Sequence, residues 1–158
     1  MVRCQPSAMR AIIEHAEEGY PAEVCGLLLG RQAEQGCTVE CALRARNLEP
    51  ARARERYELD PRDYLRADEQ ARAQGLEIVG VYHSHPDHPA RPSATDRERA
   101  WEGWRYLIVA VAAGRAQQVR AWRLAGEEFL EEPIAPGPPG EQPAGGPVPA
   151  NRPGRHPW

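Results

Sequence analysis

Short apolar runs alternate with amphipathic stretches along this chain. Three runs are apolar on both faces, which is the pattern of buried central strands, and they span residues 24–29, 76–82 and 105–113. Residues 37–45 alternate more loosely and predict a further strand. Residues 118–124 and 127–131 flank Ala125-Gly126 and predict a hairpin. The pattern predicts a sheet whose central strands are buried.

Three helices are predicted by cap residues followed by helical periodicity. Ser7, Asp60 and Ser93 are each placed to cap a helix, because their side chains accept hydrogen bonds from backbone N–H groups. The helices are expected to run to about residues 18, 74 and 101, and a glycine follows each of the first two directly.

These elements all fall within residues 1–132, which we expect to form one domain of the α/β (α+β) class. Its predicted architecture is a central mixed β-sheet flanked by about three helices. From residue 133 the composition changes to proline and glycine, and such a segment buries too little apolar surface to offset its ordering entropy. Residues 133–158 are therefore predicted to be a disordered tail.

Charge and hydropathy exclude several classes of partner. The net charge is −3 and the pI is about 6.0, so the chain lacks the basic footprint of a nucleic-acid-binding protein. No apolar run approaches ~18 residues, so no membrane span is expected. The first residues also lack the apolar core of a signal peptide, and we expect a cytoplasmic location.

The four cysteines are expected to be reduced in that compartment. Cys37 and Cys41 are placed to share one face of a strand, but their spacing is not that of a zinc clip. Packing as small apolar side chains is the favoured interpretation for them and for Cys4. Cys25 has no assigned base to activate it as a nucleophile, so packing is favoured there too.

Candidate chemistry is concentrated in residues 83–96, His-Ser-His-Pro-Asp-His-Pro-Ala-Arg-Pro-Ser-Ala-Thr-Asp. His83 and His85 follow a buried strand, and side chains two residues apart on a strand point to the same face. Pro86 lacks an N–H and is expected to end the strand. Asp96 stands at the third position of the helix that Ser93 caps. The loop between is short enough to bring both imidazoles and the carboxylate together.

Two histidines and one aspartate suit Zn²⁺ and leave a fourth position open for water, which is the arrangement of catalytic zinc sites. Such a site needs a nearby base to take the proton of the water. Glu23 is the candidate, because it directly precedes the apolar strand at residues 24–29.

A glutamate before a Gly-Leu-Leu strand, followed by His-x-His, seven residues, Ser, two residues and Asp, resembles the JAMM motif of the MPN (Mov34/PAD-1) metallopeptidases. The resemblance covers residues 7 to about 131. It implies a cytidine-deaminase-like MPN fold and one Zn²⁺ per chain held by His83, His85 and Asp96. It also implies that Glu23 is the general acid/base and that Ser93 stabilises the tetrahedral intermediate.

The same resemblance implies hydrolysis of a peptide or isopeptide bond at the C-terminal tail of a ubiquitin-like protein, specifically a β-grasp sulfur carrier. Two alternatives stay open: a non-catalytic MPN scaffold that binds protein partners, and a zinc amidohydrolase acting on a small molecule. Ser93 and Asp96 also have an ordinary interpretation as a capping box. His88 has no motif position and is expected to be exposed to solvent.

Overall fold

Eight strands form one sheet in the part of the chain that this computed structural model describes, residues 1–48 and 58–137. They are β1 (Val2–Cys4), β2 (Cys25–Ala33), β3 (Gly36–Ala45), β4 (Glu77–Pro86), β5 (Arg105–Ala112), β6 (Arg115–Ala125), β7 (Glu128–Glu132) and β8 (Ile134–Pro136). The spatial order is β7-β6-β5-β4-β2-β3-β1-β8. The β4–β5, β1–β3 and β1–β8 pairs are parallel and the others are antiparallel, so the sheet is mixed as predicted.

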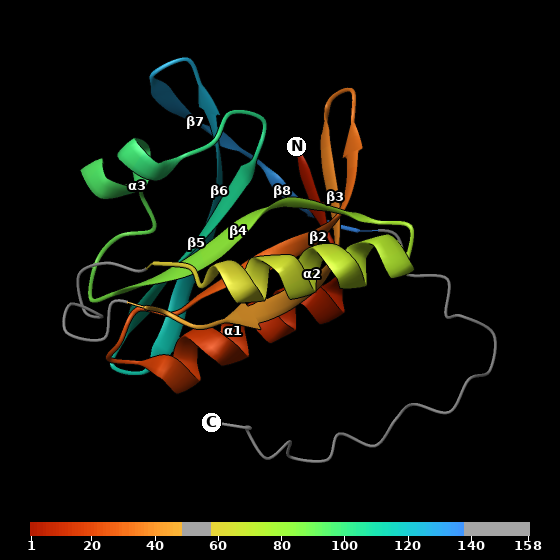
Figure 1. Cartoon of the computed structure of the whole chain (residues 1–158). Helices are drawn as coiled ribbons and strands as arrows, with labels where there is room; N and C mark the ends of the chain where they lie inside the picture. The colour runs from red at the N-terminus through yellow and green to blue at the C-terminus, as the bar shows by residue number, and fades with distance from the viewer. Residues whose placement is uncertain (49–57, 138–158) are drawn as a thin grey trace, which may run out of the picture.

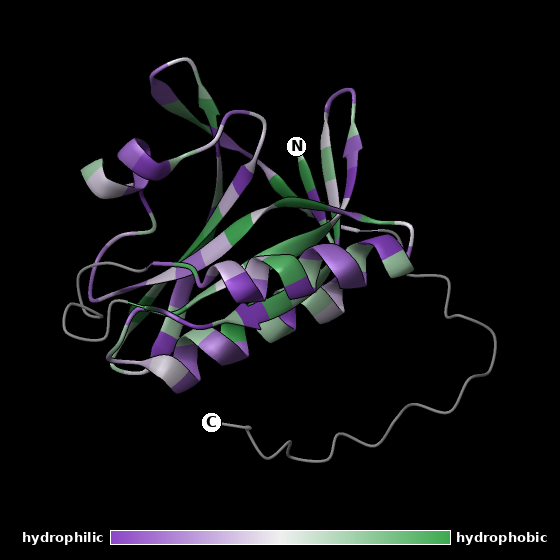
Figure 2. Ribbon diagram, in the orientation of Figure 1, coloured by the Kyte–Doolittle hydropathy of each residue, from purple (hydrophilic) through white to green (hydrophobic). Residues whose placement is uncertain are grey.

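Within the described residues three helices accompany the sheet: α1 (Pro6–Gly19), α2 (Pro61–Ala73) and α3 (Ala94–Arg99). The apolar stripe of α1, with Ile12 fully buried, packs on one face of the sheet, and α2 packs on the other through Ala67 and Ala71 (Figure 1). The apolar residues gather on the strands between the helices, while polar residues dominate the outer sides (Figure 2). None of these helices is long and apolar enough to cross a membrane.

The three predicted central strands lie within β2, β4 and β5, which are buried over most of their length. These strands confirm the α/β prediction because a strand covered on both faces has to be apolar on both faces. The predicted caps at Asp60 and Ser93 are also confirmed, since each side chain accepts a hydrogen bond from a backbone N–H in the first turn of its helix.

Several predicted boundaries were wrong. The first helix begins at Pro6, with Gln5 rather than Ser7 before it and no side-chain cap, because proline suits a position whose N–H has no partner. The first central strand does not end at residue 29: β2 and β3 pair as far as Ala33 and Gly36, so the hairpin extends beyond the covered core and is polar there.

The chain also stays ordered past the predicted boundary at residue 132. Ile134–Pro136 form β8, which pairs in parallel with β1, and Gly137 donates a backbone hydrogen bond to Cys4. Neither three-residue strand has a periodic pattern of its own, and their pairing partners are distant in sequence. The rest of the predicted tail, residues 138–158, lies outside the described residues, as do residues 49–57.

Cys37 and Cys41 do not share a face as expected. The β2–β3 register shifts between Leu29 and Gly30, which pair with Cys41 and Val39 and leave Glu40 as an extra residue. The bulge turns Cys37 into the core under α1 and Cys41 toward the α2 side. All four cysteines are free, and burial raises the pKa of Cys25 and of Cys4 to about 12, so both stay thiols.

A half-buried imidazole on α1 that contacts β4 should make the fold sensitive to acid. His15 Nδ1 lies 2.7 Å from the Tyr82 hydroxyl, and burial with the nearby Arg44 charge lowers the pKa of His15 to about 4. The unfolded chain therefore binds more protons than the folded one between about pH 6.5 and 4, and stability falls as the pH drops through that window.

We expect His15→Gln to remove this loss, because glutamine can still bond Tyr82 but does not titrate. Between about pH 6.5 and 4 the titration of His15 should cost the wild type about 1–2 kcal/mol of unfolding free energy. This value is reduced because the ring is partly exposed. The variant should not show this loss. Denaturant unfolding at several pH values measures the difference. Parallel pH profiles for both proteins would contradict this assignment.

Candidate active site

The end of β4 places His83 and His85 side by side. β4 lies between β2, where Cys25 pairs with His83, and β5, where Ile108 and Ala110 pair with His83 and His85. Both imidazoles are buried on the face that carries Val81, which α2 covers. The strand ends at Pro86, as predicted. The two histidines are therefore among its last four residues, next to the loop that leads to α3.

Three ligand-type groups converge there. The Nε2 atoms of His83 and His85 are 3.1 Å apart. Asp96 completes the group, with Oδ1 3.3 Å from His83 Nε2 and Oδ2 3.3 Å from His85 Nε2. All three side chains are at most 10% exposed, so the cluster is a desolvated one.

The tautomer of His85 is fixed by the loop that follows it. His85 Nδ1 lies 2.8 Å from the carbonyl oxygen of Pro89, and a carbonyl can only accept, so Nδ1 carries the proton. In the neutral ring the lone pair is then on Nε2, which faces His83 and Asp96. Such a backbone partner is typical of histidines that bind metals, because it orients the ring and raises its basicity.

Ser93 and Asp96 are joined by a complete capping box. The Asp96 N–H donates to Ser93 Oγ at 3.1 Å, and the Ser93 N–H donates to Asp96 Oδ2 at 2.7 Å. The ordinary interpretation of this pair is therefore confirmed. The box also holds the Asp96 carboxylate against the histidines, so one short helix start orients a group of the site.

The electrostatics of the cluster keep the carboxylate ionised. Burial acts to raise the pKa of Asp96, but the charge of His83 and hydrogen bonds to both histidines hold it well below its usual range. Burial lowers the pKa of His83. For His85 burial also acts downward, but hydrogen bonds to Asp96 and Pro89 outweigh it and raise the pKa.

Glu23 lies beside this cluster. Since Cys25 pairs with His83 in antiparallel β strands, Glu23 falls next to His85, and one of its carboxylate oxygens lies within 4.8 Å of the imidazole nitrogens. It is only 5% exposed. Burial raises the pKa of Glu23 to about 8, with His85 opposing the shift and Asp96 adding to it. A carboxyl group that titrates near neutral pH can both accept and donate a proton.

Side chains from the end of α1 and from β6 hold the backbone around the site. The Tyr20 hydroxyl donates to both carboxylate oxygens of Asp87 at 3.0 and 2.9 Å, which ties the segment before Glu23 to the turn after β4. Trp122 Nε1–H donates to the Ala90 carbonyl oxygen at 3.0 Å. These contacts fix the loop that carries the Pro89 carbonyl.

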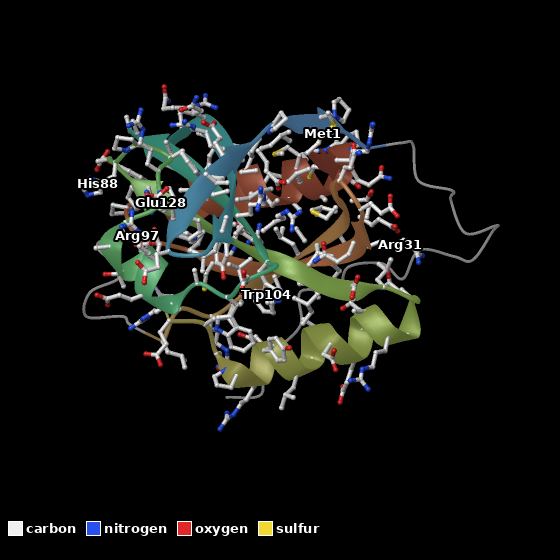
Figure 3. The ribbon with its side chains drawn as sticks, turned by 90° about the horizontal axis from the view of Figure 1, so that it is seen from above. Met1, Arg31, His88, Arg97, Trp104 and Glu128 are labelled. Carbon is white, nitrogen blue, oxygen red and sulfur yellow. The ribbon has the colours of Figure 1, made fainter. Side chains whose placement is uncertain are left out.

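Glu23, His85 and Ser93 line one cleft of about 300 Å³, together with Pro86, His88, Pro89 and Arg91. His83 and Asp96 do not line this cleft, but both contact His85, which does. All five residues singled out in the sequence therefore meet at one place. His88 is exposed, as expected, and lies on the same side of the molecule as Arg97 (Figure 3).

A second, apolar hollow of about 630 Å³ is lined in part by Val81 of β4, the strand that carries the two histidines, and it was not predicted from the sequence. It is lined by Glu58, Leu59, Pro61, Tyr64, Leu65, Val81, Arg99, Trp101, Trp104 and Tyr106, which we call the aromatic groove. Trp104 points toward α2, where it stacks on Tyr64, and Trp101 packs against it (Figure 3). The only sequence signal for this groove was the presence of two tryptophans, Trp101 and Trp104, on either side of Gly103.

The donor set fits a zinc ion. Two imidazole nitrogens and an ionised carboxylate are ligand types that zinc accepts, at bond lengths of about 2.0–2.2 Å. Ligand atoms of a tetrahedral ion are then about 3.3–3.5 Å from one another. The three separations here, 3.1, 3.3 and 3.3 Å, fall close to that value, and the cleft adjoins the cluster.

Comparison with known proteins adds the family. A model described as prokaryotic homologs of the JAB domain matches residues 5–125. A desampylase of Haloferax volcanii is 42% identical over 133 residues, covering 81% of this chain and 91% of that protein. A CysO-cysteine peptidase of Mycobacterium tuberculosis is 28% identical over 127 residues, covering 80% and 84%.

Two solved structures share the fold of this chain. The solution structure of protein DSY2949 from Desulfitobacterium hafniense has a TM-score of 0.76 and 31% identity, covering 85% of this chain and 92% of that one. A JAB1/MPN domain protein from Archaeoglobus fulgidus shares the fold with a TM-score of 0.54, at 17% identity and 85% and 97% coverage. With a family model matching more than half of the residues and a motif-bearing cleft, the chain belongs to the prokaryotic JAB/MPN family of hydrolases.

Proposed function

We propose that this chain is a zinc-dependent metallopeptidase that hydrolyses a peptide or isopeptide bond at the C-terminal tail of a ubiquitin-like β-grasp sulfur-carrier protein. The observation that carries the proposal is the convergence of His83, His85 and Asp96 within 3.3 Å of one another, beside a buried Glu23. The names of the relatives support the substrate class, since they include desampylases and a protease for TtuB conjugates.

His83, His85 and Asp96 would hold the zinc, each through an atom that already faces the others. A zinc ion bound there supplies Lewis-acid polarisation of the scissile carbonyl and lowers the pKa of a water toward ~7. Glu23, His83 and His85 also present ligand-type atoms within 4.8 Å of one another, so Glu23 is close enough to act on a water bound at the same site.

Glu23 acts as the general acid/base in this proposal. It takes a proton from the attacking water and gives it to the leaving amine, and a pKa near the working pH favours both transfers. Ser93 lines the same cleft, and its oxygen accepts from the Asp96 N–H. Its hydroxyl proton stays available to donate to the oxyanion of the tetrahedral intermediate.

The aromatic groove is the proposed surface for the ubiquitin-like protein and its tail. Val81 lines the groove and stands two residues before His83 on the same face of β4, so the groove leads into the site. Leu65 and Trp101 are each 61% exposed there, which is unusual for large apolar side chains and typical of protein-binding surfaces.

Leu65→Glu should weaken substrate capture without affecting the fold, because Leu65 is exposed on α2. We expect KM for a β-grasp conjugate to rise about tenfold, by the loss of one buried apolar contact and the burial of a charge, with kcat nearly unchanged. Leu130→Glu, on exposed β7 outside the groove, is the matched control. Equal KM values for the two variants would place the docking surface elsewhere.

The substrate class is tested by a panel of conjugates. A β-grasp sulfur carrier joined through its terminal glycine to an amino acid or to a protein lysine should be cleaved by the zinc-loaded protein. A peptide of the same tail sequence without the β-grasp domain should be cleaved poorly. Hydrolysis of small amides alone would favour the amidohydrolase alternative, and binding of the carrier without cleavage would favour the scaffold.

A free-thiol protein suits the reducing cytoplasm, which is where we propose this activity takes place.

A further inference from the structure

Both polar atoms of one peptide group, the one between Glu23 and Val24, are held by side chains. The Glu23 carbonyl oxygen accepts from Asn47 Nδ2–H at 3.0 Å. The Val24 N–H donates to Ser84 Oγ at 2.9 Å. This peptide lies before the start of β2, at the point where the regular strand ladder does not yet fix the backbone.

Ser84 comes from the strand that carries the histidines. It is fully buried between His83 and His85, and its own N–H donates to the Val24 carbonyl oxygen at 3.0 Å. Two hydrogen bonds therefore hold the backbone beside Glu23 against the segment of β4 that carries both imidazoles. A shift of one relative to the other would break two hydrogen bonds in a dry environment.

Asn47 approaches from the opposite side. Its Oδ1 accepts from the Glu58 N–H at 2.9 Å, and Asn47 forms a bridge with Leu59. Glu58 and Leu59 both line the aromatic groove. One amide side chain thus joins the groove wall to the carbonyl of Glu23.

We propose that Ser84 and Asn47 are positioning residues that set the distance of the Glu23 carboxylate from the imidazoles. The inference rests on the proposed role of Glu23 as the proton-transfer group. A misplacement of about 1 Å in such a group costs up to about 100-fold in rate. The hydrogen bonds described above join both residues to backbone atoms of residues 23, 24 and 58.

Four variants of the zinc-loaded full chain test the proposal: Ser84→Ala, Asn47→Ala, the conservative Ser84→Thr, and Ser7→Ala as an exposed serine control. We expect kcat for a β-grasp conjugate to fall about 10- to 100-fold in the two alanine variants at the site. KM and zinc per chain should stay at wild-type values. Ser84→Thr, which keeps the accepting hydroxyl, should recover most of the rate, and Ser7→Ala should match the wild type.

A second set in the Glu23→Gln background separates positioning from general structural support. If Ser84 and Asn47 act through Glu23, adding either alanine substitution to Glu23→Gln should leave the residual rate unchanged, because the group they position has already been removed. If Ser84→Ala does not fold, Asn47→Ala alone is sufficient for the same comparison.

Unchanged kcat in both alanine variants would overturn the proposal, as would loss of zinc, a rise in KM alone, or an equal further loss in the Glu23→Gln background. These outcomes all presuppose an active wild type. A zinc-loaded wild type that cleaves no conjugate would instead overturn the proposed function, and this inference with it.

Discussion

Glu23→Gln is expected to abolish cleavage while leaving zinc bound. Glutamine keeps the shape of the side chain but cannot accept a proton. Loss of a general base costs about 10²–10⁴ in rate, and the upper end is expected because the same carboxyl group must also protonate the leaving amine. Rate, zinc content and affinity for the β-grasp substrate should be measured on this one variant.

The fold should tolerate this substitution. Glu23 is buried with a pKa raised to about 8, so its native carboxyl group is already close to neutral at pH 7, and a neutral amide is a small change. Cleavage near the wild-type rate with zinc bound would show that Glu23 is not the base. Loss of zinc would make Glu23 a ligand instead, in place of Asp96.

His85→Ala is expected to remove most of the metal. Removing the outer partner of a ligand usually costs 10–100-fold in affinity, so removing the ligand itself should cost more than about 100-fold. Elemental analysis after dialysis should fall from one zinc per chain to nearly none, and cleavage should be lost with it. The lost Pro89 contact should loosen the loop as well.

His88→Ala is the matched control, because His88 lies three residues further along, lines the same cleft and is exposed. It should keep its zinc. Full zinc occupancy in His85→Ala, or equal losses in both variants, would contradict the proposed ligand set.

The central part of the fold could be predicted because its signals are local. A stretch of strand covered on both faces must be apolar, and residues 27–29 of β2, 78–82 of β4 and 106–111 of β5 have this pattern. The same holds for His83, His85 and Ser93: strand alternation and a capping box fix where these side chains point within a few residues.

The rest depends on contacts between distant segments. Strands β1 and β8 are three residues each; β1 pairs with both β3 and β8, and these partners are brought together only by folding. The bulge at Glu40, which separates Cys37 from Cys41, arises from the β2–β3 register and has no mark in the sequence. Asn47 and Ser84 are ordinary polar residues until the fold brings them to the Glu23 peptide.

The most direct test is a zinc titration of the metal-free protein against a β-grasp carrier conjugated through its terminal glycine, with intact-mass detection of the products. We expect cleavage to rise in proportion to zinc, to saturate at one ion per chain and to release the carrier with a free C-terminal glycine. A conjugate that stays intact at full zinc occupancy, or cleavage that proceeds equally without metal, would contradict it.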